Sequence, residues 1–403
     1  MNILFLTIGS MRRIGDEGIY TDLLRRFRDK GHAVYTVSAN QKRTGLPTTL
    51  ENDEGVQMLH VAIGNITACG LIEKGVSTLM IEGQYLAAIK KHFSDVKFDL
   101  VMYSTPPITF ARVVEYIRRR DGAKSYLLLK DIFPQNAVDL GMMSTRGPKA
   151  PLYRFFRAKE KKLYAQSDRI GCMSRANVDY LLRHNPEIDA ARVEICPNSI
   201  EIHNETIDPV QRAAIRAKYG VPADRKVFVY GGNLGRPQGI PQLIECLKQV
   251  ENRAGAHFLI VGSGTEAHRL EAYLAERRPG NVQYLSMLPK ADYEQLTAAC
   301  DVGLIFLDHK FTIPNFPSRL LSYMQARLPV LAATDPNTDV GLVAEENGFG
   351  WRCGSDDPTA FARMVDLALA ADLNAMGDRG FDCLKRLYDV EQSYQIIIQS
   401  LQR

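Results

Sequence analysis

The sequence of 403 residues lacks the patterns that mark several classes of protein. Its seven cysteines are scattered, odd in number and never spaced as C-x-x-C, which argues against a disulfide framework or a thiolate metal site and favours a reducing compartment. The eight histidines show no H-x-x-x-H spacing, so we expect no metal centre. No run of eighteen apolar residues appears, and the N-terminus "MNILFLTIGSMRRIGDEG" indicates a first strand rather than a signal peptide. We expect a cytoplasmic protein without a membrane span.

The composition is that of a folded protein of ordinary type. With 45% hydrophobic and 24% charged residues, the chain is long enough for two domains with full cores. The net charge is only +4, and the basic excess lies in the first half. A basic half suits an anionic lipid surface or a phosphate-bearing substrate, and equally a solvated face, while no nucleic-acid partner is expected.

Apolar runs alternate with amphipathic segments along the whole chain. The runs "NILFLTI", "AVYTVSA", "FDLVMYS" and "SYLLLK" precede a Pro- and Asn-bearing connector, and "KVFVYGG", "AHFLIVGSG", "DVGLIFL" and "PVLAATD" follow it. This alternation predicts parallel strands joined by helices, so the fold class is α/β with two doubly wound, Rossmann-like domains. We predict domains at 1–200 and 201–371, and a C-terminal helix within 372–403 that packs back on the first domain.

A glycine-rich turn in "FVYGGNLGRPQGI", residues 228–240, is the first candidate site. Gly231, Gly232, Gly235 and Gly239 allow positive φ and close approach of a ligand to the backbone, and Arg236 adds a planar cation. We favour contact with a phosphate, and a plain strand-to-helix turn is the alternative.

A second glycine pair lies in "FLIVGSGTEAHRL", residues 258–270. Gly262 and Gly264 resemble a dinucleotide fingerprint, but Ala267 occupies the place of the third glycine and no acidic residue ends the next strand. A nicotinamide cofactor is therefore disfavoured. Contact of Gly262 with a ligand and close packing of the strand remain equal alternatives.

The stretch "TIPNFPSRLLSYMQARLPVLAATD", residues 312–335, predicts a loop, a helix of about three turns and a buried strand. Asn315 is placed to cap the helix and Pro317 suits its first turn. Ser318 and Arg319 occupy that turn, where a positive side chain opposes the helix dipole unless an anion lies nearby. Arg319 therefore predicts an anionic ligand.

Three carboxylates are further candidates. Asp131 in "LLLKDIFPQNAVDLG" ends a buried-type strand, where ligands of open α/β sheets bind, although a helix cap or an ion pair with Lys130 or Arg154 is an alternative. Asp16 and Glu17 lie between the first strand and the first helix. They are acceptor-side candidates, or residues that favour the helix dipole.

The segment "PLYRFFRAKEKKLYAQSD", residues 151–168, predicts an amphipathic helix with apolar and basic side chains. It combines Leu152, Tyr153, Phe155, Phe156 and Leu163 with Arg154, Arg157, Lys159, Lys161 and Lys162. We predict peripheral association with the anionic inner face of the plasma membrane. A core-packed helix with a basic outer face is the alternative.

Several motifs together resemble the retaining glycosyltransferases of family 4. The order "GGNLGRPQG", "VGSGTE", "LPKADYEQLTAACDVGLIFL" and "PSRLLSYMQARLPVLA" carries the resemblance, and "KDIFPQNAVDLGMM" with "TIPNFPSR" resembles the bacterial WbuB-type subgroup of surface-polysaccharide enzymes. The resemblance implies the GT-B fold, in which two Rossmann-like domains face each other across a cleft. It also implies a nucleotide-sugar in the C-terminal domain, an acceptor in the N-terminal domain, and neither a metal nor another cofactor.

The resemblance also assigns roles to residues. The turn from Gly232 to Gly239 and Arg319 would hold the donor diphosphate, the backbone at Leu288 and Pro289 would read the base, and Gly15 would approach the phosphates from the opposite domain. As catalytic residues we predict Asp131, Arg236 and Arg319. As donor-binding residues we predict Gly15, Gly232, Asn233, Gly235, Gln238, Gly262, Leu288, Pro289, Asn315, Phe316, Pro317, Ser318 and Ser322.

The sequence departs from the family pattern at three places. Pro314 and Ser322 occupy positions where many members have two glutamates with seven residues between them. The glycine turn has Asn233 and Gln238 where an arginine and a lysine are common, and Asp131 stands where many relatives have a histidine. Ribose, sugar and phosphate must then be held by other groups.

We therefore predict a retaining glycosyltransferase that moves a hexosyl or N-acetylhexosaminyl group from a UDP-sugar to a glycan or polyprenyl-diphosphate-linked acceptor in bacterial surface-polysaccharide biosynthesis. A non-hydrolysing nucleotide-sugar 2-epimerase is one alternative, which would need an acid–base pair. A nucleotide-sugar-binding protein without catalysis is another.

Overall fold

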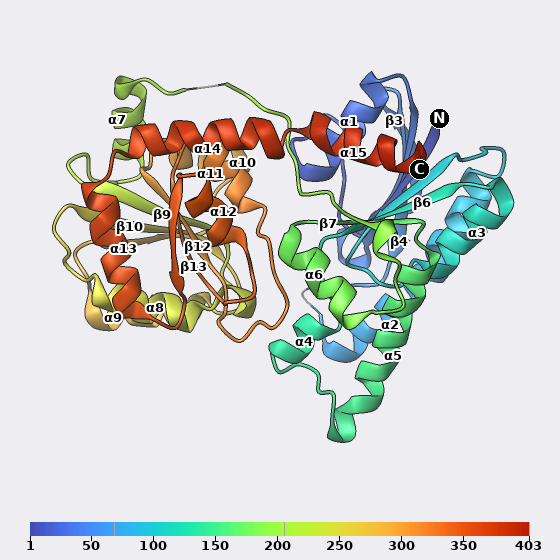
Figure 1. Ribbon diagram of the computed structural model, residues 1–403, viewed down its shortest axis with the longest axis horizontal. Helices are drawn as coiled ribbons and strands as arrows, with labels where there is room; N and C mark the ends of the chain where they lie inside the picture. Colours follow the sequence, from blue (N-terminus) through green and yellow to red (C-terminus); the bar gives the residue numbers. More distant parts are fainter. Residues whose placement is uncertain (68, 205, 403) are drawn as a thin grey trace. The chain divides into compact units, whose positions relative to one another are not determined.

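The computed structural model describes residues 1–67, 69–204 and 206–402, which fold as two compact units. The first unit comprises Met1–Glu201 and Asp389–Arg403, and the second comprises Ile202–Tyr388 (Figure 1). Each unit is built on its own mostly parallel sheet, so the predicted two-domain α/β fold is confirmed.

The sheet of the first unit has the strand order β3-β4-β2-β1-β5-β6-β7-β8 in the described residues. All neighbouring strands are parallel except β3 and β4. The pair β3–β4 was not predicted, since the edge strand β3 is largely exposed and has no apolar run. The strands are β1 (Asn2–Leu6), β2 (Ala33–Gln41), β3 (Thr49–Asp53), β4 (Val56–Ile63), β5 (Leu100–Ser104), β6 (Lys124–Leu129), β7 (Arg169–Cys172) and β8 (Val193–Ile195).

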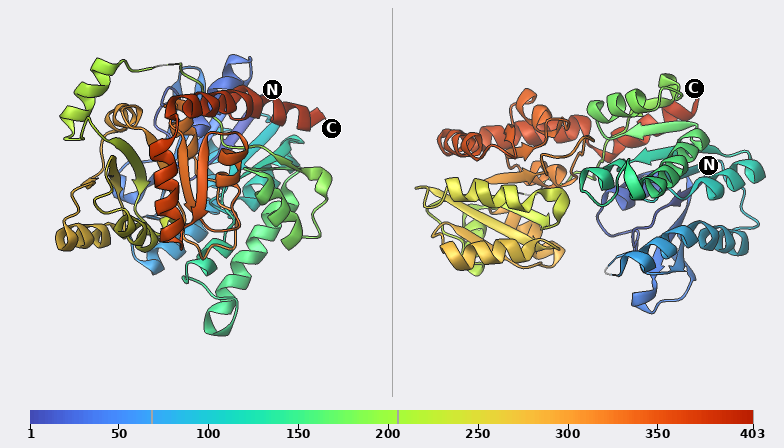
Figure 2. Two further views of the ribbon diagram at one scale, coloured as in Figure 1. Left: turned by 60° about the vertical axis from the view of Figure 1, so that its left-hand side comes forward. Right: turned by 90° about the horizontal axis from the view of Figure 1, so that it is seen from below.

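Helices cover both faces of this sheet (Figure 2). One core lies under α2, α3, α5 and α6, and a second core lies under α1 and α15 on the other face. The helices are α1 (Ile19–Asp29), α2 (Leu71–His92), α3 (Ala111–Asp121), α4 (Gln135–Asp139), α5 (Ala150–Gln166), α6 (Arg175–His184) and α15 (Val390–Gln402).

The sheet of the second unit is parallel throughout its described strands, with the order β11-β10-β9-β12-β13-β14. Its strands are β9 (Lys226–Asn233), β10 (Ala256–Ser263), β11 (Val282–Leu285), β12 (Val302–Phe306), β13 (Val330–Thr334) and β14 (Gly350–Gly354). Helices α8, α9 and α13 enclose the main core of this unit on one face. The helices are α7 (Pro209–Lys218), α8 (Ile240–Gln249), α9 (Ala267–Arg277), α10 (Lys290–Ala298), α11 (Arg319–Gln325), α12 (Val340–Glu346), α13 (Pro358–Ala370) and α14 (Leu373–Leu387).

Two helices replace the single C-terminal helix expected within 372–403. Helix α14 ends at Leu387 and belongs to the second unit, whereas α15 belongs to the first. The backbone N–H of Val390 donates to the carbonyl of Ile200 at 3.0 Å, and α15 packs on α1 through Tyr394 and Phe27, whose ring centroids lie 4.9 Å apart. Residues 372–388 therefore extend the second unit beyond the predicted limit at 371.

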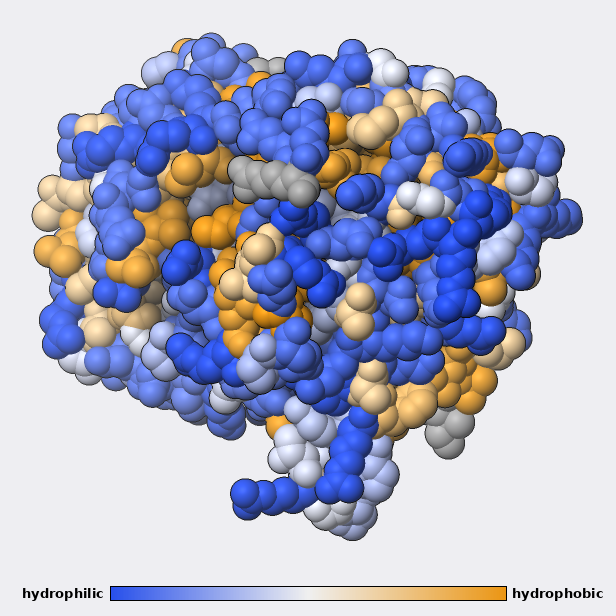
Figure 3. Space-filling view, turned by 45° about the vertical axis from the view of Figure 1, so that its right-hand side comes forward, coloured by the Kyte–Doolittle hydropathy of each residue, from blue (hydrophilic) through white to orange (hydrophobic). Residues whose placement is uncertain are grey.

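All seven cysteines are free thiols. None of the helices in the described ranges is long and apolar enough to cross a membrane. Exposed apolar side chains do occur on the first unit, on the outer sides of α2 and α5, and Figure 3 shows apolar patches that interrupt a mostly hydrophilic surface. The most exposed of them on these two helices are Val76, Leu79, Met80, Leu152 and Phe155.

Candidate active site

The strand order of the second unit creates a place for a ligand at the carboxyl end of β9. The chain leaves β9 toward β10 on one side, and β12 pairs with β9 on the other side. Ligands of open α/β sheets bind at such a point, where loops diverge from neighbouring strands. Gly232 lies at the end of β9, and Arg319 follows the loop after β12, so the fold brings two predicted residues together.

Arg319 is a cation without a carboxylate partner. Its guanidinium carbon lies 4.3 Å from the ring centroid of Tyr230, a cation–π contact. Its Nη2 is 3.1 Å from the position that a Cβ at Gly232 would occupy, so the guanidinium lies against the glycine turn. Its Nη1 is buried without a hydrogen-bond partner, and Arg319 forms no ion pair with any described residue. Since a buried donor left unpaired costs about 1–3 kcal/mol, this geometry favours an anionic ligand.

Two further tyrosines surround this guanidinium, and neither was identified from the sequence. The Tyr323 hydroxyl donates to the carbonyls of Val229 (3.1 Å) or Leu304 (3.2 Å) and accepts from the N–H of Gly231 at 3.3 Å. Burial raises the pKa of Tyr323 well above its ordinary value and also raises the pKa of Tyr293, so both stay neutral. The sequence pattern that could have indicated a contact between Tyr323 and Arg319 is their spacing of four residues on a predicted helix, because side chains at this spacing lie on the same face.

The glycine turn is braced by its own polar side chains. The Nδ2 of Asn233 donates to the Oε1 of Gln238 at 3.0 Å, and the N–H of Gly235 donates to the same oxygen at 3.2 Å. Gly232 has φ 119°, and Gly239 has φ 59°. These two residues thus need glycine for their backbone conformation, whereas Asn233 and Gln238 bond to each other across the turn.

Gly262 is explained by packing between strands. It pairs with Gly232 across β10 and β9, and a Cβ at Gly262 would lie 1.9 Å from the carbonyl oxygen of Gly232. No side chain fits there. Of the two alternatives that the sequence left open for Gly262, the structure supplies a direct reason for close packing.

Arg236 differs from Arg319 in its surroundings. Its side chain is 63% exposed, and its Nε lies 3.8 Å from the Oε1 of Glu266. The Oε2 of Glu266 accepts from the Nε of Arg269 at 2.5 Å. Glu266 is a buried acid that the sequence reading did not single out. Arg236 is therefore a solvated cation at the rim of the turn, and Arg319 is the enclosed one.

The helix predicted from residues 312–335 is shorter than expected and begins later. Helix α11 has seven residues, Ser318 is its N-cap, and no side chain caps it, so the prediction that Asn315 caps the helix is wrong. The carbonyl of Asn315 instead accepts from Thr338, because the preceding loop folds against that residue. The Phe316 ring is buried, and its centroid lies 6.1 Å from the centroid of the Tyr388 ring.

The other predicted donor-side residues of the second unit lie on loops, except Ser322, which lies on α11. Ser318 and Ser322 are exposed, and Pro317 is half-buried. Leu288 and Pro289 lie between β11 and α10, at the carboxyl edge of the same sheet as the glycine turn. The structure thus places the predicted donor residues of this unit at the strand ends, on the following loops and at the start of α11.

Asp131 lies in the first unit, directly after β6. The Thr105 hydroxyl holds its backbone, accepting from its N–H at 3.1 Å and donating to its carbonyl at 3.0 Å. The Nδ2 of Asn136 donates to both carboxylate oxygens at 2.8 Å. Burial raises the pKa of Asp131 to about 6, while hydrogen bonds from the backbone of Ile132 and from the Asn136 side chain oppose the rise. Among the described residues Asp131 forms no ion pair with Lys130 or Arg154, so that alternative is excluded there.

The loop after β1 carries the remaining candidates. Gly15, Asp16 and Glu17 are exposed and precede α1, which begins at Ile19. The acid in the first turn of α1 is Asp22, whose carboxylate accepts from the N–H of Gly18 at 3.0 Å. Asp16 and Glu17 thus lie outside α1. The alternative prediction was that they interact favourably with the dipole of this helix.

Comparison with known proteins bears on this geometry. Residues 211–379 match the family model described as Glycosyl transferases group 1, a segment that includes the glycine turn and Arg319. A curated relative described as a probable glycosyltransferase aligns over most of the chain. The chain is a glycosyltransferase.

The glycosyltransferase is similar to bacterial proteins along much of its length. It is 26% identical over 309 residues to the probable glycosyltransferase WbjE of Pseudomonas aeruginosa, which covers 76% of this chain and 74% of WbjE. It is 22% identical over 253 residues to the putative colanic acid biosynthesis glycosyl transferase WcaI of Escherichia coli, covering 62% and 60% of the two chains. Its fold matches Anabaena HepE, crystallised with UDP-glucose, at a TM-score of 0.70 and 16% identity, over 100% of this chain and 99% of HepE.

Proposed function

We propose that this glycosyltransferase moves a sugar from a UDP-sugar to a glycan or lipid-linked glycan in bacterial surface-polysaccharide biosynthesis, with retention of configuration, as a member of the WbuB-type subgroup. The observation that carries the proposal is the buried Nη1 of Arg319, which has no hydrogen-bond partner among the described residues, in a side chain that forms no ion pair with them. A donor diphosphate supplies the missing anion. The colanic acid assignment of WcaI and the UDP-glucose bound to HepE support the pathway and the donor.

The transfer of a sugar from its nucleotide donor depends chiefly on stabilisation of the leaving diphosphate. As the bond between the anomeric carbon and the diphosphate oxygen breaks, negative charge builds on that oxygen, and the acceptor hydroxyl forms the new bond while losing its proton. A fixed guanidinium aimed at the developing charge lowers the barrier, because it needs no reorganisation at the moment of reaction. Arg319 fits this role through its cation–π contact with Tyr230, and Arg236 adds a second, more exposed cation at the rim. The proposal includes no metal ion.

Asp131 is proposed as a further catalytic residue of the first unit. Its pKa of about 6 lets the carboxyl exchange a proton near neutral pH, which suits a residue that handles the proton of an acceptor hydroxyl. Thr105 and Asn136 fix its backbone and carboxylate.

The exposed side chains of α5 that are available for membrane contact are mainly apolar, not basic. Leu152 and Phe155 are 50% and 43% exposed. By contrast, several predicted basic residues are paired within the unit: Arg157 with Glu160, Lys159 with Glu82, Lys161 with Glu187 and Lys162 with Glu115. We propose that this apolar start of α5 touches the membrane that holds a polyprenyl-linked acceptor.

A donor-consumption assay tests the function. The protein is incubated with a panel of nucleotide-sugars, and release of the free nucleotide is measured with and without an extract of polyprenyl-linked acceptors. We expect acceptor-dependent release of UDP. The proposal fails if no donor is consumed, or if UDP-sugars interconvert without acceptor, the behaviour of a 2-epimerase.

A further inference from the structure

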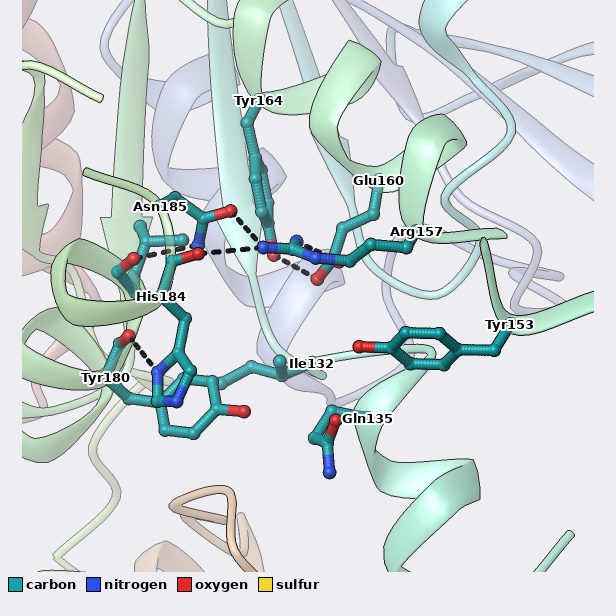
Figure 4. Close-up of a pocket in the computed structure, with 10 residues that line it drawn as sticks. Ile132, Gln135, Tyr153, Arg157, Glu160, Tyr164, Tyr180, His184 and Asn185 are labelled. Atoms are coloured by element: carbon teal, nitrogen blue, oxygen red, sulfur yellow. Dashed lines mark hydrogen bonds and ion pairs between the residues drawn. The ribbon is translucent and has the colours of Figure 1, made fainter. Parts of the chain in front are cut away.

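A polar cavity of about 220 Å³ lies wholly within the first unit, among α4, α5 and α6 (Figure 4). Ile132 forms part of its wall, and Ile132 directly follows Asp131. The cavity lies outside the segment that matches the glycosyltransferase family model. The function proposed above assigns it no role.

On one wall of the cavity, the polar side chains already form hydrogen bonds and an ion pair with one another. The Arg157 guanidinium forms an ion pair with Glu160 and donates to the Oδ1 of Asn185 at 2.6 Å. The other oxygen of Glu160 accepts from the Tyr164 hydroxyl at 2.7 Å. The positive and negative charges of this wall cancel, so the cavity offers no net charge to attract a phosphate or a carboxylate.

The opposite side offers two unoccupied hydroxyls. In Figure 4 the Tyr153 and Tyr180 hydroxyls point into the same space from α5 and α6. Neither hydroxyl bonds to any described residue, and each can donate one hydrogen bond and accept others. The Tyr180 ring is stacked on the His184 ring with centroids 3.9 Å apart and an angle of 24°, so its position is supported. Gln135 also borders the space, and its amide donates to the Oδ1 of Asp139 at 2.8 Å.

We propose that this cavity binds one neutral sugar ring of the acceptor glycan, an inference that rests on the proposed function. Three properties favour such a ligand. Two tyrosine hydroxyls that face the same space match a ring rich in hydroxyl groups, and an aromatic face packs against the C–H face of a pyranose. The volume is below the range of roughly 300–1,000 Å³ for drug-sized ligands, so a single ring fits better than a nucleotide. Because Ile132 adjoins Asp131, the ring would lie beside the loop that starts at the candidate catalytic residue.

The probes are methyl glycosides of glucose, galactose, mannose, fucose and N-acetylglucosamine, presented to the full chain in saturation-transfer NMR. The variants Tyr153→Phe and Tyr180→Phe each remove one hydroxyl and keep the ring. Tyr35→Phe is the matched control, since Tyr35 lies in the same unit with its ring against Phe93 and Phe98. We expect at least one glycoside to bind, and each cavity variant to weaken that binding roughly three- to tenfold. The control should bind as the wild type does.

Kinetics separate this inference from the proposed function. With a working acceptor, Tyr153→Phe and Tyr180→Phe should raise the acceptor KM by a similar factor and leave the donor KM unchanged. If the wild type consumes no donor yet binds a glycoside through these hydroxyls, the proposed function fails and the sugar site stands. If transfer proceeds, but neither variant changes glycoside binding or the acceptor KM, the sugar site is overturned. Melting temperatures within a degree or so of the wild type would confirm that the variants fold.

Discussion

The Arg319 guanidinium stacks 4.3 Å from the centre of the Tyr230 ring, and its Nη2 lies against Gly232 at the end of the same strand, β9. The ring holds the guanidinium through a cation–π contact, and the absent side chain of Gly232 leaves room for it. One nitrogen of Arg319 remains buried and unpaired within the described structure. This arrangement holds a cation ready for an anion before any ligand binds, which is the property that stabilises a departing diphosphate.

Replacing Arg319 tests this arrangement directly. Arg319→Ala should lower kcat/KM for the donor roughly ten- to a hundredfold, because a charge-assisted hydrogen bond contributes about 1.5–3 kcal/mol. Arg319→Lys should recover only part, since an ammonium cannot reproduce the planar, two-pronged contact. Steady-state kinetics measure both, and Arg352→Ala, at an exposed ion pair with Glu345, is the control. Wild-type kinetics with a lowered melting temperature would show that Arg319 is structural.

Tyr230 should act as a positioning residue. Tyr230→Leu removes the stacking ring, and we expect the donor KM to rise roughly three- to tenfold, as a buried cation–π contact contributes about 1–2 kcal/mol. Tyr230→Phe keeps the ring and loses only the hydroxyl that donates to the carbonyl of Asn233 at 2.8 Å. Its donor KM should change by less than that of Tyr230→Leu. Equal effects of both variants would contradict a role for the ring in orienting Arg319.

Gly232→Ala should harm donor binding and stability together. Its φ of 119° costs a non-glycine residue about 1–3 kcal/mol, and the new Cβ would meet Arg319 at 3.1 Å. Chemical denaturation and donor titration measure the two losses. Gly75→Ala in α2 is the control, because a Cβ at this position would have no described atom within 4 Å apart from its own helix backbone and chain neighbours, and alanine favours a helix by about 0.5–1 kcal/mol. A Gly232→Ala enzyme with normal donor affinity would argue against contact at this turn.

Asp131 should destabilise the protein as it ionises. Its pKa is about 6 in the folded state and 3.8 as a free group, so the native state binds more protons between these values and stability falls as pH rises from about 4 to about 6. Asp131→Asn removes this loss, so its stability relative to the wild type should increase across that window and stay higher above it. Denaturation curves from pH 4 to 8 measure the difference. A difference that does not vary with pH would show that the pKa is not raised.

The apolar start of α5 should control binding to anionic vesicles. The double variant Leu152→Ser and Phe155→Ser should reduce co-sedimentation with phosphatidylglycerol-containing vesicles by about tenfold, because less apolar surface enters the interface. Leu367→Ser on α13, where the side chain is 52% exposed in the second unit, should bind as the wild type does. Undiminished binding of the double variant would place any membrane contact elsewhere.

Local sequence patterns predicted the architecture well. The spacing of apolar runs specifies buried parallel strands and the helices between them, because each run must be long enough to cross a sheet and apolar on both faces. The pattern failed where a strand is exposed, as in β3, and at the C-terminus, where a break at Tyr388 and Asp389 divides one expected helix between two units. Exposure and unit membership depend on long-range contacts that periodicity does not contain.

By itself, the sequence determined the two-unit α/β fold, the glycine turn at Gly232 and the unfavourable position of the positive Arg319 at a helix N-terminus. Each of these follows from residues close together in the chain. Only the tertiary structure decided that Tyr230 and Tyr323 enclose Arg319, that Asn233 and Gln238 brace the turn, and that α4, α5 and α6 form a cavity. The physical reason is that strand pairing and helix packing bring distant residues together. Whether a polar side chain keeps a partner after that packing cannot be read from its neighbours in sequence.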